Sequence, residues 1–145
     1  MKLIIQRVDY ATVNINNDET RKIGKGLLVY LGVKKGEDEK ILEKAVSKLL
    51  KLRFFENEEG KLKLNIQDVD GEILLISNFS LYAKAEKGTT LSFDNCANKE
   101  EAKQIYDKFL KILRDKYTKV ITGEFRTTML INSLSNGPVN VILDL

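Results

Sequence analysis

The sequence predicts an α+β fold: a single domain over residues 1–145, with a mostly antiparallel sheet or partly closed barrel and two main helices packed on it. Two segments repeat apolar residues at helical spacing, whereas the other apolar residues fall into short runs bounded by turn residues. The chain contains no internal repeat, linker or low-complexity stretch, and its 145 residues are enough to bury one core.

The N-terminal part of the chain predicts strands. Residues 4–15 alternate apolar and polar positions, and the alternation changes phase near Tyr10, which indicates one bent strand or a strand pair with a bulge. A turn is expected at residues 16–18. The uninterrupted apolar run of residues 26–33 is typical of a central strand that is buried on both faces.

The first helix is expected over residues 37–52, where apolar residues recur at helical spacing. Its other side carries a ridge of lysines at positions 40, 44, 48 and 51. Such a ridge can face phosphate, but a solvated surface is the preferred interpretation. A short strand at residues 53–56 and a turn at residues 57–60 are expected to follow.

The second helix has a sequence signal at its start. Asn98 is a good N-cap, and Glu101 follows three residues later, as in a capping box. An apolar face then continues from Ala102 to Leu113. Strands are predicted on both sides of this helix, at residues 72–79, 119–125, 128–134 and 139–143.

Composition excludes several kinds of active site. The sequence has no histidine and a single cysteine, Cys96, so imidazole-based triads, histidine zinc sites and internal disulfides are excluded. We therefore expect neither a metal site nor a cofactor. A lone cysteine fits a reducing cytoplasm, and no apolar run is long enough for a membrane helix. The net charge of +3 permits an anionic partner without requiring one.

Two short stretches remain as candidate sites. The predicted strand at 72–79 ends in Ser-Asn-Phe-Ser at residues 77–80, and strand ends followed by loops often carry functional groups. The other stretch is Asn-Gly-Pro-Val at residues 136–139, which holds the only proline of the chain. From the pattern alone, a polar strand end and a turn before the last strand are the simpler interpretations.

Blocks of sequence along the whole chain add a stronger signal. They are MKLIIQRV at the start, GKGLLVYLGV and LRFFENEEGK further on, then SNFSLYA, TGEF and NGPV. In this order they resemble the D-aminoacyl-tRNA deacylase family, in which SNFSLYA is similar to a Ser-Gln-Phe-Thr-Leu signature and NGPV to a Gly-Pro signature. Each block alone is weakly specific, whereas their order over a chain of matching length is a strong signal.

The resemblance implies a cytoplasmic homodimer that hydrolyses the ester between a D-amino acid, or glycine, and the 3′ end of tRNA, and that rejects L-aminoacyl-tRNA. It implies a cis bond between Gly137 and Pro138, delivered across the dimer interface into the partner's site. In the family, the backbone carbonyls of this pair hold the amino group of the substrate and leave no room for an L side chain. Arg7 matches a family arginine near this loop.

The resemblance also assigns roles near the strand end. Ser77, Asn78 and Phe79 are expected to shape the catalytic site, and Met129 matches a family methionine that packs near the terminal adenosine. Backbone N–H groups near Phe79 and Ser80 are expected to stabilise the oxyanion. Ser80 is not expected to act as a covalent nucleophile, since no base is available to activate it.

The chain departs from the family pattern at several positions. Asn78 stands where the family has glutamine, Ser80 where it has threonine, and Asn140 where threonine usually follows Gly-Pro-Val. The loop of residues 88–93 lacks the basic residue and the proline that are common in the family. Two alternatives therefore stay open: editing of another mischarged tRNA, such as one bearing L-alanine, and a non-catalytic tRNA-binding module.

Overall fold

A computed structural model describes residues 1–86 and 88–145. Within these two ranges, none of the helices has the length and apolar character needed to cross a lipid bilayer. The elements, including one 3-10 helix (η1), follow each other as β1 (Lys2–Ile15), β2 (Glu19–Ile23), β3 (Gly26–Gly32), α1 (Ile41–Lys51), β4 (Phe55–Glu56), β5 (Leu62–Leu64), β6 (Glu72–Ser77), η1 (Phe79–Tyr82), α2 (Lys99–Lys116), β7 (Val120–Thr122) and β8 (Met129–Asp144).

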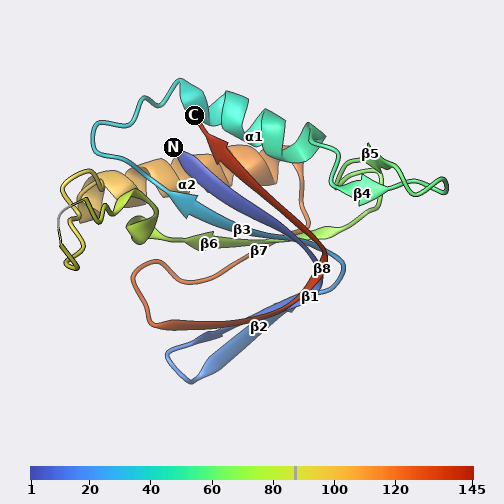
Figure 1. Cartoon of the computed structure of the whole chain (residues 1–145), viewed down its shortest axis with the longest axis horizontal. Coiled ribbons are helices and arrows are strands. Elements are labelled where there is room, and N and C mark those ends of the chain that lie inside the picture. The colour runs from blue at the N-terminus through green and yellow to red at the C-terminus, as the bar shows by residue number, and fades with distance from the viewer. Residues whose placement is uncertain (87) are drawn as a thin grey trace.

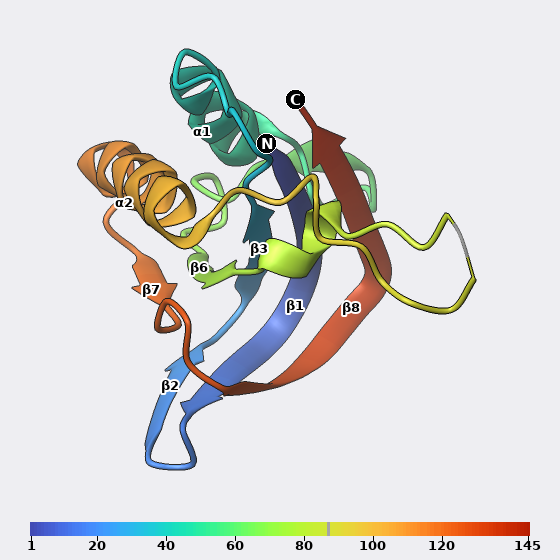
Figure 2. The same cartoon turned by 90° about the vertical axis from the view of Figure 1, so that its left-hand side faces the viewer.

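The sheet is built around the long strand β1. The N-terminal half of β1 pairs antiparallel with β3 and its C-terminal half with β2, while β8 runs antiparallel along its other edge. β3 continues through parallel pairs into β6 and then β7. β1 and β8 curl away from the helices together (Figure 1, Figure 2), so the mixed sheet is nearly closed into a barrel. The predicted α+β class is confirmed.

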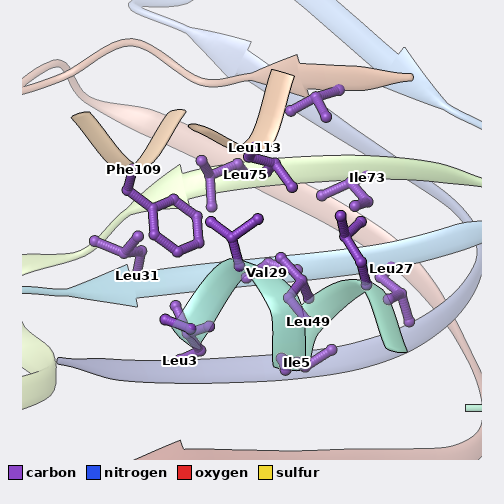
Figure 3. Close-up of a cluster of buried hydrophobic side chains, with 14 of the residues drawn as sticks. Leu3, Ile5, Leu27, Val29, Leu31, Leu49, Ile73, Leu75, Phe109 and Leu113 are labelled. Atoms are coloured by element: carbon purple, nitrogen blue, oxygen red, sulfur yellow. The ribbon is translucent and has the colours of Figure 1, made fainter. Parts of the chain in front are cut away.

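The two helices cover one face of the sheet, and the larger core lies between them and the strands (Figure 1). Figure 3 shows Leu3 of β1 and Val29 of β3 in this core, together with Leu49 of α1 and Phe109 of α2. The opposite face buries a second apolar cluster inside the curl of the sheet, made of Val8, Ala11, Val13, Ile15, Ile23, Leu28, Leu74 and Ile76. Because β3 and β6 contribute to both clusters, their apolar runs are uninterrupted, as the sequence predicted.

The phase change near Tyr10 corresponds to an irregularity in β1. The pairing of β1 with β8 shifts register between Gln6 and Val8 and again between Val8 and Tyr10. Apolar residues before the shift belong to the core under the helices, and those after it belong to the second cluster. The prediction of one bent strand with a bulge is therefore confirmed.

The first helix is shorter than the sequence predicted. It begins at Ile41 rather than at residue 37, because the chain before it is held by contacts from outside the helix. The N–H groups of Gly36 and Glu37 both donate to the side chain of Glu101, over 2.6 and 3.3 Å. A tertiary contact therefore overrides the local helical pattern at this end.

The start of α2 agrees with the capping prediction. The Asn98 side chain accepts a hydrogen bond of 2.9 Å from the N–H of Glu101. The helix α2 begins at Lys99, directly after Asn98. The strand predicted at residues 53–56 is limited to β4, which forms a hairpin with β5. β5 was not predicted, because its residues (Leu-Lys-Leu) are too few to show a period.

The last two predicted strands are one strand, β8. Its pairing with β1 is interrupted at residues 136–139, which stand opposite Arg7 as a bulge. The prediction of a turn that ends one strand and starts another is therefore wrong. Among the described strands, β8 pairs with β1 alone. A proline fits within β8 because no strand on its outer edge needs a hydrogen bond from a backbone N–H group.

Candidate functional site

A pocket of about 540 Å³ opens where the C-terminal ends of β3 and β6 meet η1 and the first turn of α2. The segment between β7 and β8 forms its remaining wall. These parts gather at the left of the molecule in Figure 1, the side that faces the viewer in Figure 2. The lining comprises residues 30, 31, 33, 76–79, 97–99, 102, 106, 125–129 and 131.

The polar end of β6 forms one wall of this pocket, and hydrogen bonds fix its turn into η1. The N–H of Asn78 donates to the carbonyl of Leu31 over 2.8 Å, which extends the β3–β6 pairing by one residue. The Asn78 side chain then caps η1, since its Oδ1 accepts from the N–H of Ser80 at 3.2 Å and from the Ser80 hydroxyl at 2.6 Å. Ser80 is therefore turned towards the cap, and it does not line the pocket.

Phe79 lies at the mouth of the pocket with 63% of its surface exposed. Its ring packs against Phe93 with the centroids 5.2 Å apart, and its carbonyl accepts a hydrogen bond of 3.2 Å from the Cys96 thiol. Burial raises the pKa of that thiol, which keeps it neutral. Among the described residues, the N–H of Phe79 has no hydrogen-bond partner, so it can donate to a bound ligand.

Aromatic and apolar side chains form the interior of the pocket. The rings of Tyr106 and Phe125 pack with their centroids 5.9 Å apart. Burial raises the pKa of Tyr30, and it raises the pKa of Tyr106 to about 12, so both phenols are neutral near neutral pH. Met129 packs against Gly123, where an added β-carbon would lie 2.5 Å from the methionine sulfur.

The predicted Gly-Pro site lies elsewhere in the chain. Gly137 and Pro138 are exposed on the bulge of β8, the peptide bond between them is cis, and Gly137 has a φ of +124°. A smaller cavity of about 300 Å³ adjoins this bulge, and its lining includes Arg7, Lys25 and Phe55. The bend of β8 and the ends of β3 and β6 lie at opposite sides of the molecule in Figure 1.

Hydrogen bonds from the buried Arg7 side chain hold the bulge of β8 in place. Only 7% of its surface is exposed, and its guanidinium donates to the carbonyls of Asn136 at 3.0 Å and Phe54 at 2.9 Å. The Asn136 amide in turn donates to a carboxylate oxygen of Asp9 at 2.6 Å, and Glu56 lies 3.6 Å from the guanidinium. The backbone just before Gly137 is thus held by the planar, charged guanidinium of Arg7 and by the hydrogen bond between the Asn136 and Asp9 side chains.

The predicted site residues fall into two separate groups. The pocket brings together Ser77, Asn78, Phe79 and Met129, and Ser80 stands next to it. The bulge brings together Arg7, Gly137 and Pro138. A single chain does not unite the two groups, because neither Gly137 nor Pro138 lines the pocket.

Sequence reasoning missed several lining residues. Tyr30 and Tyr106 lie in apolar runs that have the pattern of core residues, and an aromatic residue in such a run gives no separate signal, whether it is half-buried like Tyr30 or buried like Tyr106. Arg126 and Lys99 are polar neighbours of predicted elements, with no motif around them. Across residues 1–86 and 88–145, no group of three or more potential metal ligands comes together.

Known proteins are similar to this chain over its whole length. The sequence model of the D-Tyr-tRNA(Tyr) deacylase family matches residues 4–144. A D-aminoacyl-tRNA deacylase of Finegoldia magna is 44% identical over 144 residues, which are 99% of this chain and 97% of that protein. The Aquifex aeolicus protein of the same name is 40% identical over 144 residues, with the same coverage of 99% and 97%.

Two solved structures have the same fold. The c-Myc DNA Unwinding Element Binding Protein superposes with a TM-score of 0.93 at 34% identity, and the match covers 100% of this chain and 99% of that one. A probable eukaryotic D-amino acid tRNA deacylase superposes with a TM-score of 0.87 at 21% identity, covering 99% and 98%. The second likeness bears on the fold alone.

Proposed function

The chain belongs to the D-Tyr-tRNA(Tyr) deacylase family, and from this premise we propose that it hydrolyses the ester bond of D-aminoacyl-tRNA as one catalytic domain. The observation that carries the proposal is the full-length similarity to D-aminoacyl-tRNA deacylases, such as that of Finegoldia magna. The pocket at the end of β6 supports it, because it has the size and the apolar walls that suit a nucleoside with an attached amino acid.

The terminal nucleoside packs in this proposal against the aromatic and sulfur-containing wall formed by Phe125 and Met129. The 3′ ester then lies at the polar end of β6. The free N–H of Phe79 donates to the oxyanion that forms when water attacks the ester carbonyl, and one such donor is worth about 2.7–4 kcal/mol in other enzymes. The amide of Ser80 is already engaged by the Asn78 cap, so Phe79 is the principal donor.

Water is the nucleophile in this reaction scheme. The Ser80 hydroxyl donates its proton to the amide oxygen of Asn78, which is not a base and cannot activate it. Neither phenol in the pocket is ionised near neutral pH. An aminoacyl ester next to a ribose hydroxyl is itself reactive, so orientation and oxyanion stabilisation are the contributions left to the protein.

The bulge of one subunit completes the pocket of the other in a homodimer, according to this proposal. The substrate carries an ammonium group, yet the charged residues of the pocket lining are Lys99 and Arg126, both cations. None of the described lining residues supplies a carboxylate to balance the ammonium, and Gly137 and Pro138, which are exposed, can supply backbone acceptors from a second chain. β8 supports association, since it pairs with β1 alone among the described strands and carries the exposed apolar residues Leu130, Leu134 and Ile142.

This arrangement yields the specificity that we propose. A wall of rigid backbone at the amino-acid position accepts a hydrogen atom or a D side chain and clashes with an L side chain. D-aminoacyl-tRNA is then a substrate, and so is glycine that is esterified to the wrong tRNA, whereas L-aminoacyl-tRNA is rejected. The reaction takes place in the cytoplasm and needs no cofactor or metal.

The test is a set of initial rates with D-tyrosyl-, L-tyrosyl-, glycyl- and L-alanyl-tRNA, each measured with and without a chelator. We expect rapid cleavage of the D-tyrosyl and glycyl esters, no cleavage of L-tyrosyl-tRNA, and no effect of the chelator. Faster cleavage of L-alanyl-tRNA would identify a different editing enzyme. Binding of tRNA without cleavage of any ester would identify a binding module.

A further inference from the structure

We propose that Arg126 and Lys99 form a phosphate-binding subsite at the pocket, which holds a backbone phosphate of the 3′-terminal nucleotides of the RNA. This inference rests on the proposed function, because it assumes that the terminal nucleoside occupies the pocket. It assigns a binding role to two residues outside the SNFSLYA and NGPV blocks. Its ligand chemistry is a phosphodiester anion next to a purine nucleoside.

The charge of the lining is the first argument. Arg126 and Lys99 come from different parts of the chain, the β7–β8 segment and the first turn of α2, and both line the same pocket. None of the described residues that line the pocket carries a carboxylate. Within the described part of the chain neither cation takes part in an ion pair, whereas Lys103, Lys108, Lys111 and Lys116 of α2 each form one.

The nearby carboxylates are occupied or lie outside the lining. Glu124, two residues before Arg126, lies 3.2 Å from the guanidinium of Arg21. Glu101 accepts from the backbone N–H groups of residues 36 and 37. Glu100 is exposed and does not line the pocket. The two cations thus remain available to an anion that enters the pocket.

The backbone at Arg126 is the second argument. Its φ of +61° lies in the left-handed region, which is uncommon for a residue with a β-carbon. The loop around it is held by contacts of its neighbours: Arg21 donates to the carbonyls of Thr122 and Gly123, and the hydroxyl of Thr127 donates to the carbonyl of Glu124. A charged residue in this conformation at a pocket wall indicates a functional position.

The position of the subsite fits the ligand. A nucleoside whose 3′ ester reaches the end of β6 must let the RNA strand leave through the mouth of the pocket. Lys99 is the first residue of α2, where free N–H groups and the helix dipole favour an anion, so the helix adds to the charge of the two side chains. A phosphodiester at this point can be contacted both from α2 and from the β7–β8 segment.

The first experiment measures binding alone and does not depend on catalysis. Unacylated CpCpA and adenosine are titrated into wild type, Arg126→Gln, Lys99→Gln and the double variant over a range of salt. We expect each single variant to bind CpCpA about tenfold more weakly, as for a lost charged hydrogen bond, and to bind adenosine unchanged. The slope of log affinity against log salt should become shallower by about 0.7 per lost contact.

Two further variants serve as controls. Arg126→Lys keeps the charge and should recover part of the affinity, and Lys48→Gln removes an exposed lysine of α1 and should change nothing. Equal loss of affinity for CpCpA and adenosine would overturn the subsite, because it would point to altered packing. Unchanged CpCpA affinity in the double variant would overturn it as well. Inorganic phosphate is then added as a competitor of CpCpA. Competition well below millimolar phosphate would identify a general anion site, whereas the absence of competition would identify a site that needs the attached nucleoside.

The second experiment separates this inference from the proposed function. D-tyrosyl-tRNA and D-tyrosyl-adenosine, which lacks phosphate, are compared as substrates. We expect Arg126→Gln to raise KM for the tRNA about tenfold with little change in kcat, and to leave the adenosine ester unaffected. If wild type cleaves both esters and the variant behaves like wild type on both, the subsite is wrong and the function stands. If wild type cleaves neither, the function is wrong, and the CpCpA titration still decides on the subsite.

Discussion

The pocket at the end of β6 and the bulge of β8 differ in shape, polarity and charge. The pocket is concave and largely apolar, and its charged lining residues are cations. The bulge is exposed and polar, and a buried guanidinium, a carboxylate and an amide hold its backbone. The described residues of the pocket leave room for a nucleoside but include no counter-charge for an ammonium, whereas the bulge offers backbone acceptors beside a smaller cavity of about 300 Å³. The difference indicates that each is half of a site.

The largest effect is expected at the bulge, from Gly137→Ala. At a φ of +124°, an added β-carbon would lie 2.9 Å from Val139 Cγ2 and 3.0 Å from a guanidinium nitrogen of Arg7. The bulge must shift to relieve these contacts, and a displacement of about 1 Å in a site can lower kcat/KM about 100-fold. The assay is deacylation of D-tyrosyl-tRNA.

Gly60→Ala is the matched control for this variant. Gly60 also has a positive φ, +73°, but a β-carbon there has nothing within 4 Å, and it lies in the turn between β4 and β5. Its activity should equal that of wild type. An equal loss of activity in both variants would show that backbone strain alone, rather than the position of the bulge, explains the result.

A smaller effect is expected in the pocket wall, from Gly123→Ala. The new β-carbon would lie 2.5 Å from the sulfur of Met129 and 3.0 Å from Ile76 Cδ1, so the flexible methionine side chain must move. A change of one methyl group in an apolar pocket alters binding about tenfold, so we expect KM to rise by about that factor with kcat nearly unchanged. A fall in kcat at constant KM would mean that Met129 does not contact the nucleoside.

Ser80→Ala tests the catalytic role within the pocket group. The hydroxyl contributes one exposed hydrogen bond to Asn78, so its loss should lower kcat by no more than about threefold. A complete loss of activity, or an acyl-enzyme trapped with wild type, would contradict the water mechanism. Ser47→Ala on α1, a partly exposed serine outside both groups and away from β8, is the control for an equivalent change.

The pH dependence of deacylation should show no titration of a tyrosine in the pocket. The chain has no histidine, and burial raises the pKa of Tyr30, and that of Tyr106 to about 12. A raised phenol pKa keeps the neutral form at every pH well below it, so neither residue changes charge between about pH 6 and 8. Over this range kcat should therefore follow the titration of the substrate amine alone. A break in kcat at any other pH would require a protein base.

Local patterns predicted much of the fold. The apolar runs gave β3 and β6, and Asn98 with Glu101 marked the start of α2 to the residue. The prediction was wrong where tertiary contacts determine the local structure. Glu101 holds residues 36 and 37 outside α1. Arg7 holds the segment around Gly137 as a bulge within one strand, where a turn between two strands was predicted. Neither partner can be identified from sequence spacing, because each is distant along the chain.

Only part of the candidate site was predictable from the sequence, because the rest of it also depends on contacts between distant segments. The SNFSLYA and NGPV blocks directed attention to Phe79 and Gly137 through their resemblance to family signatures, whereas the pattern alone favoured a strand end and a turn. Tyr30, Tyr106 and Phe125 share the helical or strand periods of core residues and become site residues only through the position of the pocket. That position depends on where the start of α2 lies relative to the ends of β3 and β6, which no single segment encodes.

The claim that two chains supply the two halves of one site has a direct test in mixed dimers. One chain carries Ser77→Trp, which fills the pocket, and the other carries Gly137→Ala; each is first shown to be folded, dimeric and inactive alone. Each purified mixed dimer then contains one pocket and one bulge that are both unaltered and come from different chains. We predict that it recovers about half of the activity of the wild-type dimer, since one of its two sites is intact. A mixed dimer that forms but remains inactive would contradict the account.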